Sequence, residues 1–148
     1  MKILIVDDVN LMHLHFKNIL VDTIGVNDHD IFVAKSVTQA LDIMHSVDLD
    51  IIFLDIMLPD MDGIDAIKLF KRIQPEARII MQTAKSDKET IVRAIQKGAE
   101  SYIKKPLSLE SIIKVLGFEK EEGESVEDII VEAESIIVET ENIMATAV

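Results

Sequence analysis

The 148-residue sequence contains no Cys, no Trp, one Tyr and only three Pro. The absence of Cys excludes disulfides, thiolate metal sites and cysteine nucleophiles, and it fits a reducing compartment. No apolar run approaches the roughly 20 residues that a membrane-spanning helix requires. The five Gly residues are scattered over positions 25, 63, 98, 117 and 123, so no glycine-rich loop is present to cradle a nucleotide phosphate.

Basic residues are also scarce, and the formal net charge of −12 is unevenly distributed. Residues 119–148 hold ten acidic side chains and one Lys, a net charge of −9, whereas residues 1–118 hold seventeen acidic and fourteen basic side chains, a net charge of −3. Such a chain should not bind nucleic acid. Because residues 1–3 pass directly into a strand pattern, we expect no signal peptide, no membrane association and a cytoplasmic protein.

Short apolar runs alternate with amphipathic segments throughout residues 1–118. The runs predict five strands, at residues 2–6, 31–34, 50–55, 78–82 and 101–104. The segments between and after them predict five helices, at about residues 11–21, 36–46, 64–73, 88–97 and 108–117. This alternation predicts an α/β domain with a parallel sheet and helices on both of its faces.

The first helix is expected to begin after a cap at Asn10 and to bury Leu11, Leu14 and Ile19, with Phe16 as a further candidate for the buried face. His13 and His15 lie on the same helix two positions apart, so they point to different faces and cannot chelate an ion together. We expect both to be surface or boundary residues without a function.

Carboxylates follow two of the predicted strands, at the point where each strand ends. Asp7 and Asp8 follow the first strand, and Asp55 closes the third. If these parallel strands are neighbours, the three carboxylates meet at one edge of the sheet, where their repulsion requires a cation. Oxygen ligands without His or Cys suit Mg²⁺, so we expect Mg²⁺ as the cofactor.

The fourth and fifth strands end in Thr83 and Lys105, which belong to the same edge. A carboxylate can act as a nucleophile and accept a phosphoryl group. A hydroxyl and an ammonium can bind the phosphoryl oxygens, and Mg²⁺ can neutralise their charge. Together these residue types indicate phosphoryl transfer to a carboxylate.

Residues 1–118 resemble the receiver domain of two-component response regulators, of the single-domain, chemotaxis-regulator-like kind. The resemblance rests on an ordered set of motifs: residues 5–8 (Ile-Val-Asp-Asp), Leu54-Asp55 followed by Pro59, Met61, Asp62 and Gly63, Thr83-Ala84, Gly98-Ala99, and residues 104–106 (Lys-Lys-Pro). It implies a flavodoxin-like, doubly wound, five-stranded parallel sheet of strand order 2-1-3-4-5. It also implies a cis peptide bond between Lys105 and Pro106.

The resemblance also implies a role for each site residue. Asp55 would accept the phosphoryl group from the phosphohistidine of a sensor histidine kinase. Asp8, Asp55 and the backbone carbonyl of Met57 would bind Mg²⁺ directly, and Asp7 would act mainly through water. Thr83 and Lys105 would bind the phosphoryl group, and Thr83 and Tyr102 would form the switch.

The implied function is a phosphorylation-activated switch that signals by docking to a downstream target protein. It would be no enzyme apart from catalysing its own phosphorylation and dephosphorylation. The alternatives are a phosphorelay intermediate that passes the phosphoryl group on, or a Mg²⁺-dependent aspartyl-phosphate phosphatase. A haloacid-dehalogenase-like phosphatase would place Asp-x-Asp after its first strand, whereas here Asp7 and Asp8 are adjacent.

Residues 119–148 lie outside the resemblance and form an acidic C-terminal extension. Ser125 to Asp128 fits a capping box, and the apolar positions that follow form one broad stripe opposed by Glu. We therefore expect an extra amphipathic helix over about residues 126–145, docked against a second copy in a homodimer or, less favoured, against its own domain. Thirty residues do not suffice for a DNA-binding or catalytic output domain.

Overall fold

The computed structural model describes residues 1–84 and 88–117. Five parallel strands pair in the order β2-β1-β3-β4-β5. They are β1 (Ile3–Val6), β2 (Ile31–Ala34), β3 (Ile51–Asp55), β4 (Arg78–Thr83) and β5 (Ser101–Lys104). The α/β class, the parallel sheet and the strand order expected from the sequence are therefore confirmed.

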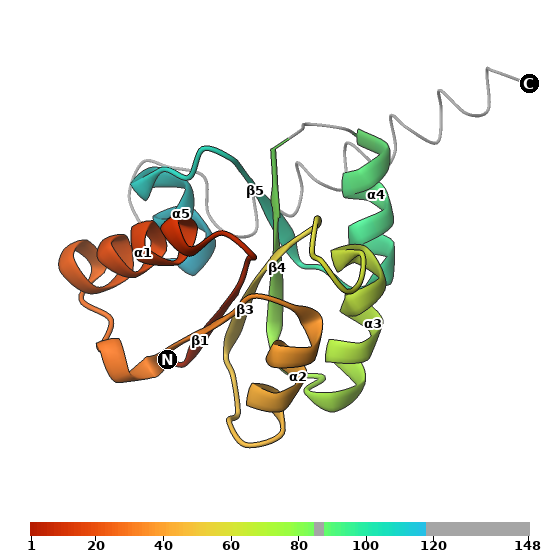
Figure 1. Cartoon of the computed structure of the whole chain (residues 1–148). Helices are drawn as coiled ribbons and strands as arrows, with labels where there is room; N and C mark the ends of the chain where they lie inside the picture. Colours follow the sequence, from red (N-terminus) through yellow and green to blue (C-terminus); the bar gives the residue numbers. More distant parts are fainter. Residues whose placement is uncertain (85–87, 118–148) are drawn as a thin grey trace, which may run out of the picture.

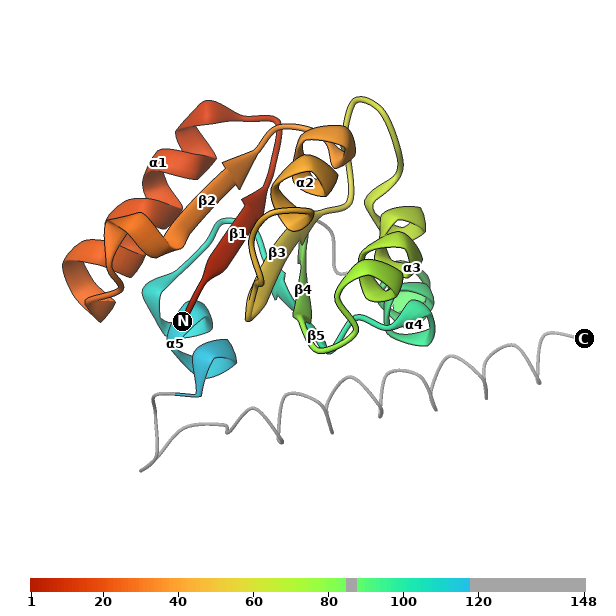
Figure 2. The same cartoon turned by 90° about the horizontal axis from the view of Figure 1, so that it is seen from below.

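The helices follow the strands in alternation: α1 (Asn10–Asn18) with a π-helical continuation (Ile19–Ile24), α2 (Val37–Met44), α3 (Gly63–Ile73), α4 (Lys88–Lys97) and α5 (Leu109–Leu116). Helices α1 and α5 cover one face of the sheet, and α2, α3 and α4 cover the other (Figures 1 and 2). The extra helix expected over about residues 126–145 lies outside the described residues. Among the described residues, no helix is long and apolar enough to span a membrane.

Each central strand contributes side chains to two hydrophobic cores, because successive side chains point to opposite faces of the sheet. In β1, Ile3 and Ile5 pack beneath α1 and α5, whereas Leu4 and Val6 pack beneath α2, α3 and α4. All four are fully buried. Burial on both faces explains why these strands are continuous apolar runs rather than alternating ones.

The prediction for the buried face of α1 was only partly right. Phe16 is fully buried and Ile19 is half-buried against the same core, as expected. Leu11 and Leu14, however, are 71% and 56% exposed, and the other buried residues are His13 and, in the π-helical turn, Leu20. The apolar residues occur on more than one side of the helix, so their spacing does not fix its orientation. His13 is therefore a buried residue, not the surface or boundary residue that was expected.

The expected cap of α1 was also wrong. Asn10 is the first helical residue, and the N-cap is Val9, whose side chain makes no capping hydrogen bond. The local acceptor is Asp7 instead, whose Oδ1 accepts a hydrogen bond of 2.9 Å from the Val9 backbone N–H. The first carboxylate of the sheet edge thus also orders the entry into α1.

Candidate functional site

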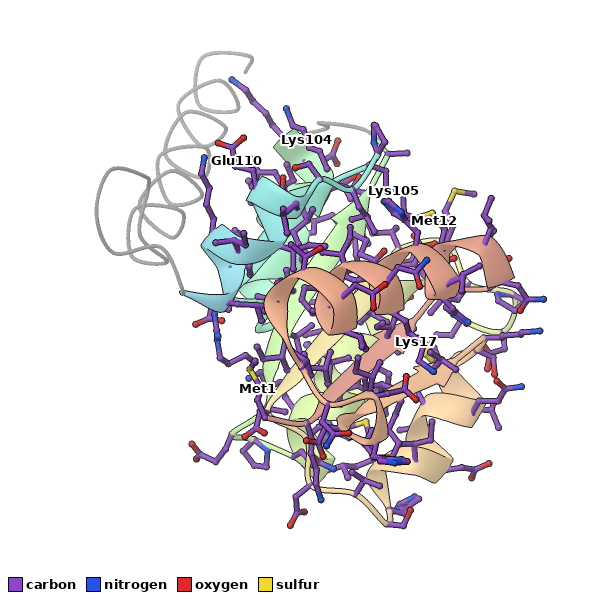
Figure 3. The ribbon with its side chains drawn as sticks, turned by 90° about the vertical axis from the view of Figure 1, so that its left-hand side faces the viewer. Met1, Met12, Lys17, Lys104, Lys105 and Glu110 are labelled. Atoms are coloured by element: carbon purple, nitrogen blue, oxygen red, sulfur yellow. The ribbon has the colours of Figure 1, made fainter. Side chains whose placement is uncertain are left out.

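The site residues come together because their strands are parallel neighbours. Asp7 follows β1, Asp55 ends β3, Thr83 ends β4, and Lys105 follows β5, so all lie at the carboxyl edge of the sheet. Figure 3 shows Lys104 and Lys105 toward this end of the molecule and Met1 toward the other. Open α/β sheets bind their ligands at this edge. The site lies at the topological switch point between β1 and β3, where the chain changes from one side of the sheet to the other.

Three carboxylates meet at this edge, as the sequence predicts. One oxygen each from Asp7, Asp8 and Asp55 lies within 4.8 Å of the others. Asp7 is fully buried, Asp55 is 7% exposed, and Asp8 is exposed. The cluster offers only hard oxygen ligands and has an open side toward solvent, so its chemistry fits a hydrated Mg²⁺ ion.

Lys105 bridges two of these carboxylates. Its Nζ donates to Asp7 Oδ2 at 3.1 Å and to Asp55 Oδ2 at 3.0 Å, across 98 and 50 residues of chain. The ammonium neutralises part of the negative charge of this buried pair. The site can therefore present a nucleophilic carboxylate oxygen and a cation to the same incoming group.

Burial disfavours the charged forms of both Asp55 and Lys105. Burial raises the pKa of Asp55 and the negative charge of Asp7 adds to this rise, so that the pKa of Asp55 lies above its ordinary value although the hydrogen bond and attraction from Lys105 lower it. Burial lowers the pKa of Lys105, but Asp55 and Asp7 together outweigh it, so the pKa of Lys105 lies above its ordinary value. One ammonium is shared by two carboxylates. The attraction of both therefore offsets the cost of burying the Lys105 charge, whereas a share of one ammonium does not offset the cost of burying the Asp55 charge.

Two of the carboxylates, those of Asp8 and Asp55, line a hollow of about 400 Å³. Thr83, 5% exposed, lies in its wall together with the 80% exposed Met57. The remaining lining residues that bear on the chemistry are Thr90 and Lys105. A tetrahedral group bound to Asp55 would thus have the Thr83 hydroxyl and the Lys105 ammonium around it.

The loop between β3 and α3 positions Met57 beside Asp55. The backbone N–H of Met57 points toward Asp55 Oδ1 at 3.4 Å, and Met57 and Asp62 form an isolated antiparallel bridge. Gly63 closes this loop, because its N–H donates to the Ile56 carbonyl at 2.7 Å and a Cβ there would overlap the Asp55 carbonyl oxygen. Only glycine fits at this position.

Tyr102 lies on β5, opposite Met81 in the register, and is half-buried against the core beneath α2, α3 and α4. It lies one strand beyond Thr83, whose partner on β5 is Lys104. The peptide bond between Lys105 and Pro106 is cis, as expected.

Two residues at this edge were not identified from the sequence. Thr90 lines the hollow from the first turn of α4, and Asp60 ties the β3–α3 loop to α2. A threonine near a helix start is a common cap, so its type gave no indication of a site. The residues that Asp60 contacts lie 22 and 23 positions away in the sequence, so no local sequence pattern indicates the contact.

The comparisons with known proteins agree with this geometry. The family model described as the response regulator receiver domain matches residues 3–117. The chain is 35% identical over 116 residues to the chemotaxis protein CheY of Bacillus subtilis strain 168, covering 78% of this chain and 93% of that protein.

Two solved structures share the fold. A two-component response regulator from Clostridium difficile superposes with a TM-score of 0.70 at 26% identity, covering 80% of this chain and 93% of that one. A response regulator from Burkholderia pseudomallei, with a phosphorylated aspartic acid and a calcium ion, gives a TM-score of 0.67 at 27% identity and covers 78% and 65% of the two chains.

Receiver domains are phosphorylation-activated switches that generally use Mg²⁺ at an acidic site, and they interact with kinases and downstream targets. The fold, the acidic edge and the family match all lead to the same conclusion: this chain belongs to the CheY-like receiver domains of two-component response regulators.

Proposed function

We propose that Asp55 is the phosphoacceptor of this receiver domain and that a sensor histidine kinase supplies the phosphoryl group. An Asp55 carboxylate oxygen forms the new bond to phosphorus while the bond from phosphorus to the donor's imidazole nitrogen breaks. The observation that carries the proposal is the Lys105 ammonium, 3.0 Å from Asp55 in a hollow that also contains Asp8 and Thr83. The Burkholderia relative with its phosphorylated aspartic acid supports the same chemistry.

The other site residues have separate tasks in this proposal. Lys105 binds a phosphoryl oxygen as a point charge, and the Thr83 hydroxyl donates to another. Asp8, Asp55 and the Met57 carbonyl would hold Mg²⁺, and Asp7 would act through water. A bound Mg²⁺ would supply positive charge against the phosphoryl oxygens. The chain thereby catalyses its own phosphorylation, and water at the same site later removes the group.

Labelling of the full chain with a small phosphodonor such as acetyl phosphate tests this assignment. We expect Mg²⁺-dependent incorporation in the wild type, none in Asp55→Asn, and reduced Mg²⁺ affinity in Asp8→Ala. Asp62→Asn is a matched control, because Asp62 is a nearby loop carboxylate that caps α3 through the Ile64 N–H. Full labelling of Asp55→Asn would refute the assignment. Turnover of a fluorogenic phosphate ester would instead favour the phosphatase alternative.

The proposed output is a population shift between two packings of the domain. Phosphorylation draws Thr83 toward the phosphoryl group, and Tyr102 on the next strand turns inward to fill the space. The target protein would then bind the face made by α4, β5 and α5. Beryllofluoride, which mimics the phosphoryl group, should change both Tyr102 fluorescence and target binding.

We further propose that residues 1–118 form the receiver domain and residues 119–148 an extension that joins two copies in a homodimer. We also propose that the chain acts in the cytoplasm. Its net charge of −12 favours a protein partner over a nucleic acid.

A further inference from the structure

Asp60 belongs to the β3–α3 loop, but its carboxylate is bonded to a different element. Its Oδ1 accepts from the Val37 backbone N–H at 3.0 Å. Its Oδ2 accepts from the backbone N–H of Thr38 at 2.9 Å and from the Thr38 hydroxyl at 2.8 Å. Val37 and Thr38 are the first residues of α2, so a carboxylate of one loop caps the start of a distant helix.

Helix α2 already has a cap of its own. The Ser36 hydroxyl accepts from the Gln39 backbone N–H at 3.1 Å, and the Gln39 side chain accepts in return from the Lys35 N–H at 2.9 Å. Asp60 accepts hydrogen bonds from the two backbone N–H groups that this local cap does not bond, those of Val37 and Thr38. The additional cap therefore has a structural effect beyond α2, which is to anchor the loop that carries Asp60.

That loop also carries Met57, whose carbonyl is expected to bind the metal ion. The 80% exposed side chain of Met57 cannot fix its own backbone through packing. At its far end the loop is held by Asp62, whose Oδ1 accepts from the Ile64 N–H at 2.8 Å, and by the Gly63 N–H. These contacts tie the loop to α3, whereas those of Asp60 tie it to α2.

We propose that Asp60 is a positioning residue of the metal site: by fastening the loop to α2, it holds the Met57 carbonyl where it completes the ligand set of Asp8 and Asp55. This inference rests on the proposed function. Asp60 itself is not placed to replace a ligand, because both of its oxygens are occupied by α2.

The charge state of Asp60 supports this anchoring. Slight burial raises its pKa, but the hydrogen bonds from Thr38 and Val37 outweigh burial and hold the pKa of Asp60 below its ordinary value. The carboxylate is therefore ionised at neutral pH, and hydrogen bonds to an ionised acceptor are stronger than neutral ones.

The test is a Mg²⁺ titration of the full, unphosphorylated chain by calorimetry, with unfolding in urea measured on the same samples. We expect Asp60→Ala to weaken Mg²⁺ binding about 10-fold, the scale seen when groups that orient metal ligands are removed. Thr38→Val removes one of the three hydrogen bonds and should give a smaller loss. Asp60→Asn keeps an acceptor oxygen and provides the measurement if Asp60→Ala does not fold.

Ser36→Ala is the matched control, because it removes the local cap of α2 without touching the loop. We expect it to be less stable while its Mg²⁺ affinity stays at the wild-type value. Equal losses of affinity in Ser36→Ala and the Asp60 variants would overturn the inference, since destabilised α2 would then be sufficient. Unchanged affinity in every Asp60 variant would overturn it as well. A wild-type chain that binds no Mg²⁺ would refute the proposed metal site itself, and with it this inference.

Discussion

At the scale of single residues, the buried carboxylate of Asp55 makes the stability of the metal-free domain depend on pH. Burial raises the folded-state pKa of Asp55 above its unfolded value, so the folded protein binds this proton more tightly. The stabilisation from that proton is complete below the unfolded pKa and is lost as the pH rises through the folded pKa. At neutral pH the ionised Asp55 therefore costs folding free energy.

We accordingly expect Asp55→Asn to unfold at higher urea concentration than the wild type at pH 7 in the presence of a chelator. The advantage should shrink as the pH is lowered through the range in which Asp55 is protonated. Added Mg²⁺ should stabilise the wild type more than the variant. Asp42→Asn, which removes a carboxylate on α2, controls for the change in net charge. An advantage independent of pH would contradict the explanation.

Gln82 is a second buried polar residue whose cost can be measured. It lies beside Asp55 in the register of β3 and β4 and is fully buried, and neither polar atom of its side chain has a hydrogen-bond partner among the described residues. A buried polar group without a partner costs about 1–3 kcal/mol. Gln82→Met, which keeps the unbranched shape, should therefore raise the free energy of unfolding by a similar amount. A neutral or destabilised variant would indicate that an ordered water satisfies the amide.

At the scale of elements, the junction between β3 and α3 depends on Gly63. A Cβ at this position would overlap the Asp55 carbonyl oxygen and approach the Ile56 backbone, neither of which is a flexible side-chain end. Gly63→Ala should cost about 1–3 kcal/mol of stability, the usual range for overpacking, and should also slow phosphorylation by displacing Asp55.

Gly25→Ala provides the contrast for that measurement. Gly25 has a φ of +87°, but a Cβ added to it would meet no atom of the described residues within 4 Å, so its substitution strains only the local backbone. We expect it to lower stability without changing the rate of phosphorylation. Equal effects of both substitutions on that rate would contradict a specific role for Gly63.

The elements also show how far sequence reasoning extends. Strands buried on both faces are continuous apolar runs, so β1, β3 and β4 could be located directly, and the polar residues at the ends of β1, β3 and β5 predicted the cluster of Asp7, Asp55 and Lys105. The buried face of α1 could be predicted only in part: Phe16 and Ile19 do pack against the core, but the equally apolar Leu11 and Leu14 occupy the exposed side.

The tie between Asp60 and α2 could not be predicted for a different reason. An Asp in a loop after Pro59 is an ordinary turn residue, and its acceptor oxygens give no indication of a donor more than twenty residues away. Which backbone amides the Asp60 carboxylate contacts is determined only by how α2 packs beside the loop. Long-range hydrogen bonds of single side chains are set by the assembled fold and not by any periodic pattern.

At the scale of the whole molecule, the extension of residues 119–148 determines the oligomeric state in our proposal. Truncation after Phe118 removes ten acidic residues and the apolar stripe. We expect the truncated chain to sediment as a monomer and the full chain as a dimer, with Mg²⁺-dependent labelling of Asp55 retained in both. A truncated chain unchanged in mass, stability and binding of an apolar dye would mean that the extension serves a separate partner.

The hydrogen bond from Lys105 to Asp7 joins the end of the first strand to the residue that follows the last one, 98 positions apart. No fragment that stops before Lys105 can contain the site, and a ribosome must make almost the entire domain before Asp55 gains its cation. In our proposal, competence to accept a phosphoryl group is therefore acquired late in synthesis, because a chain that ends before Lys105 lacks the ammonium that faces Asp55.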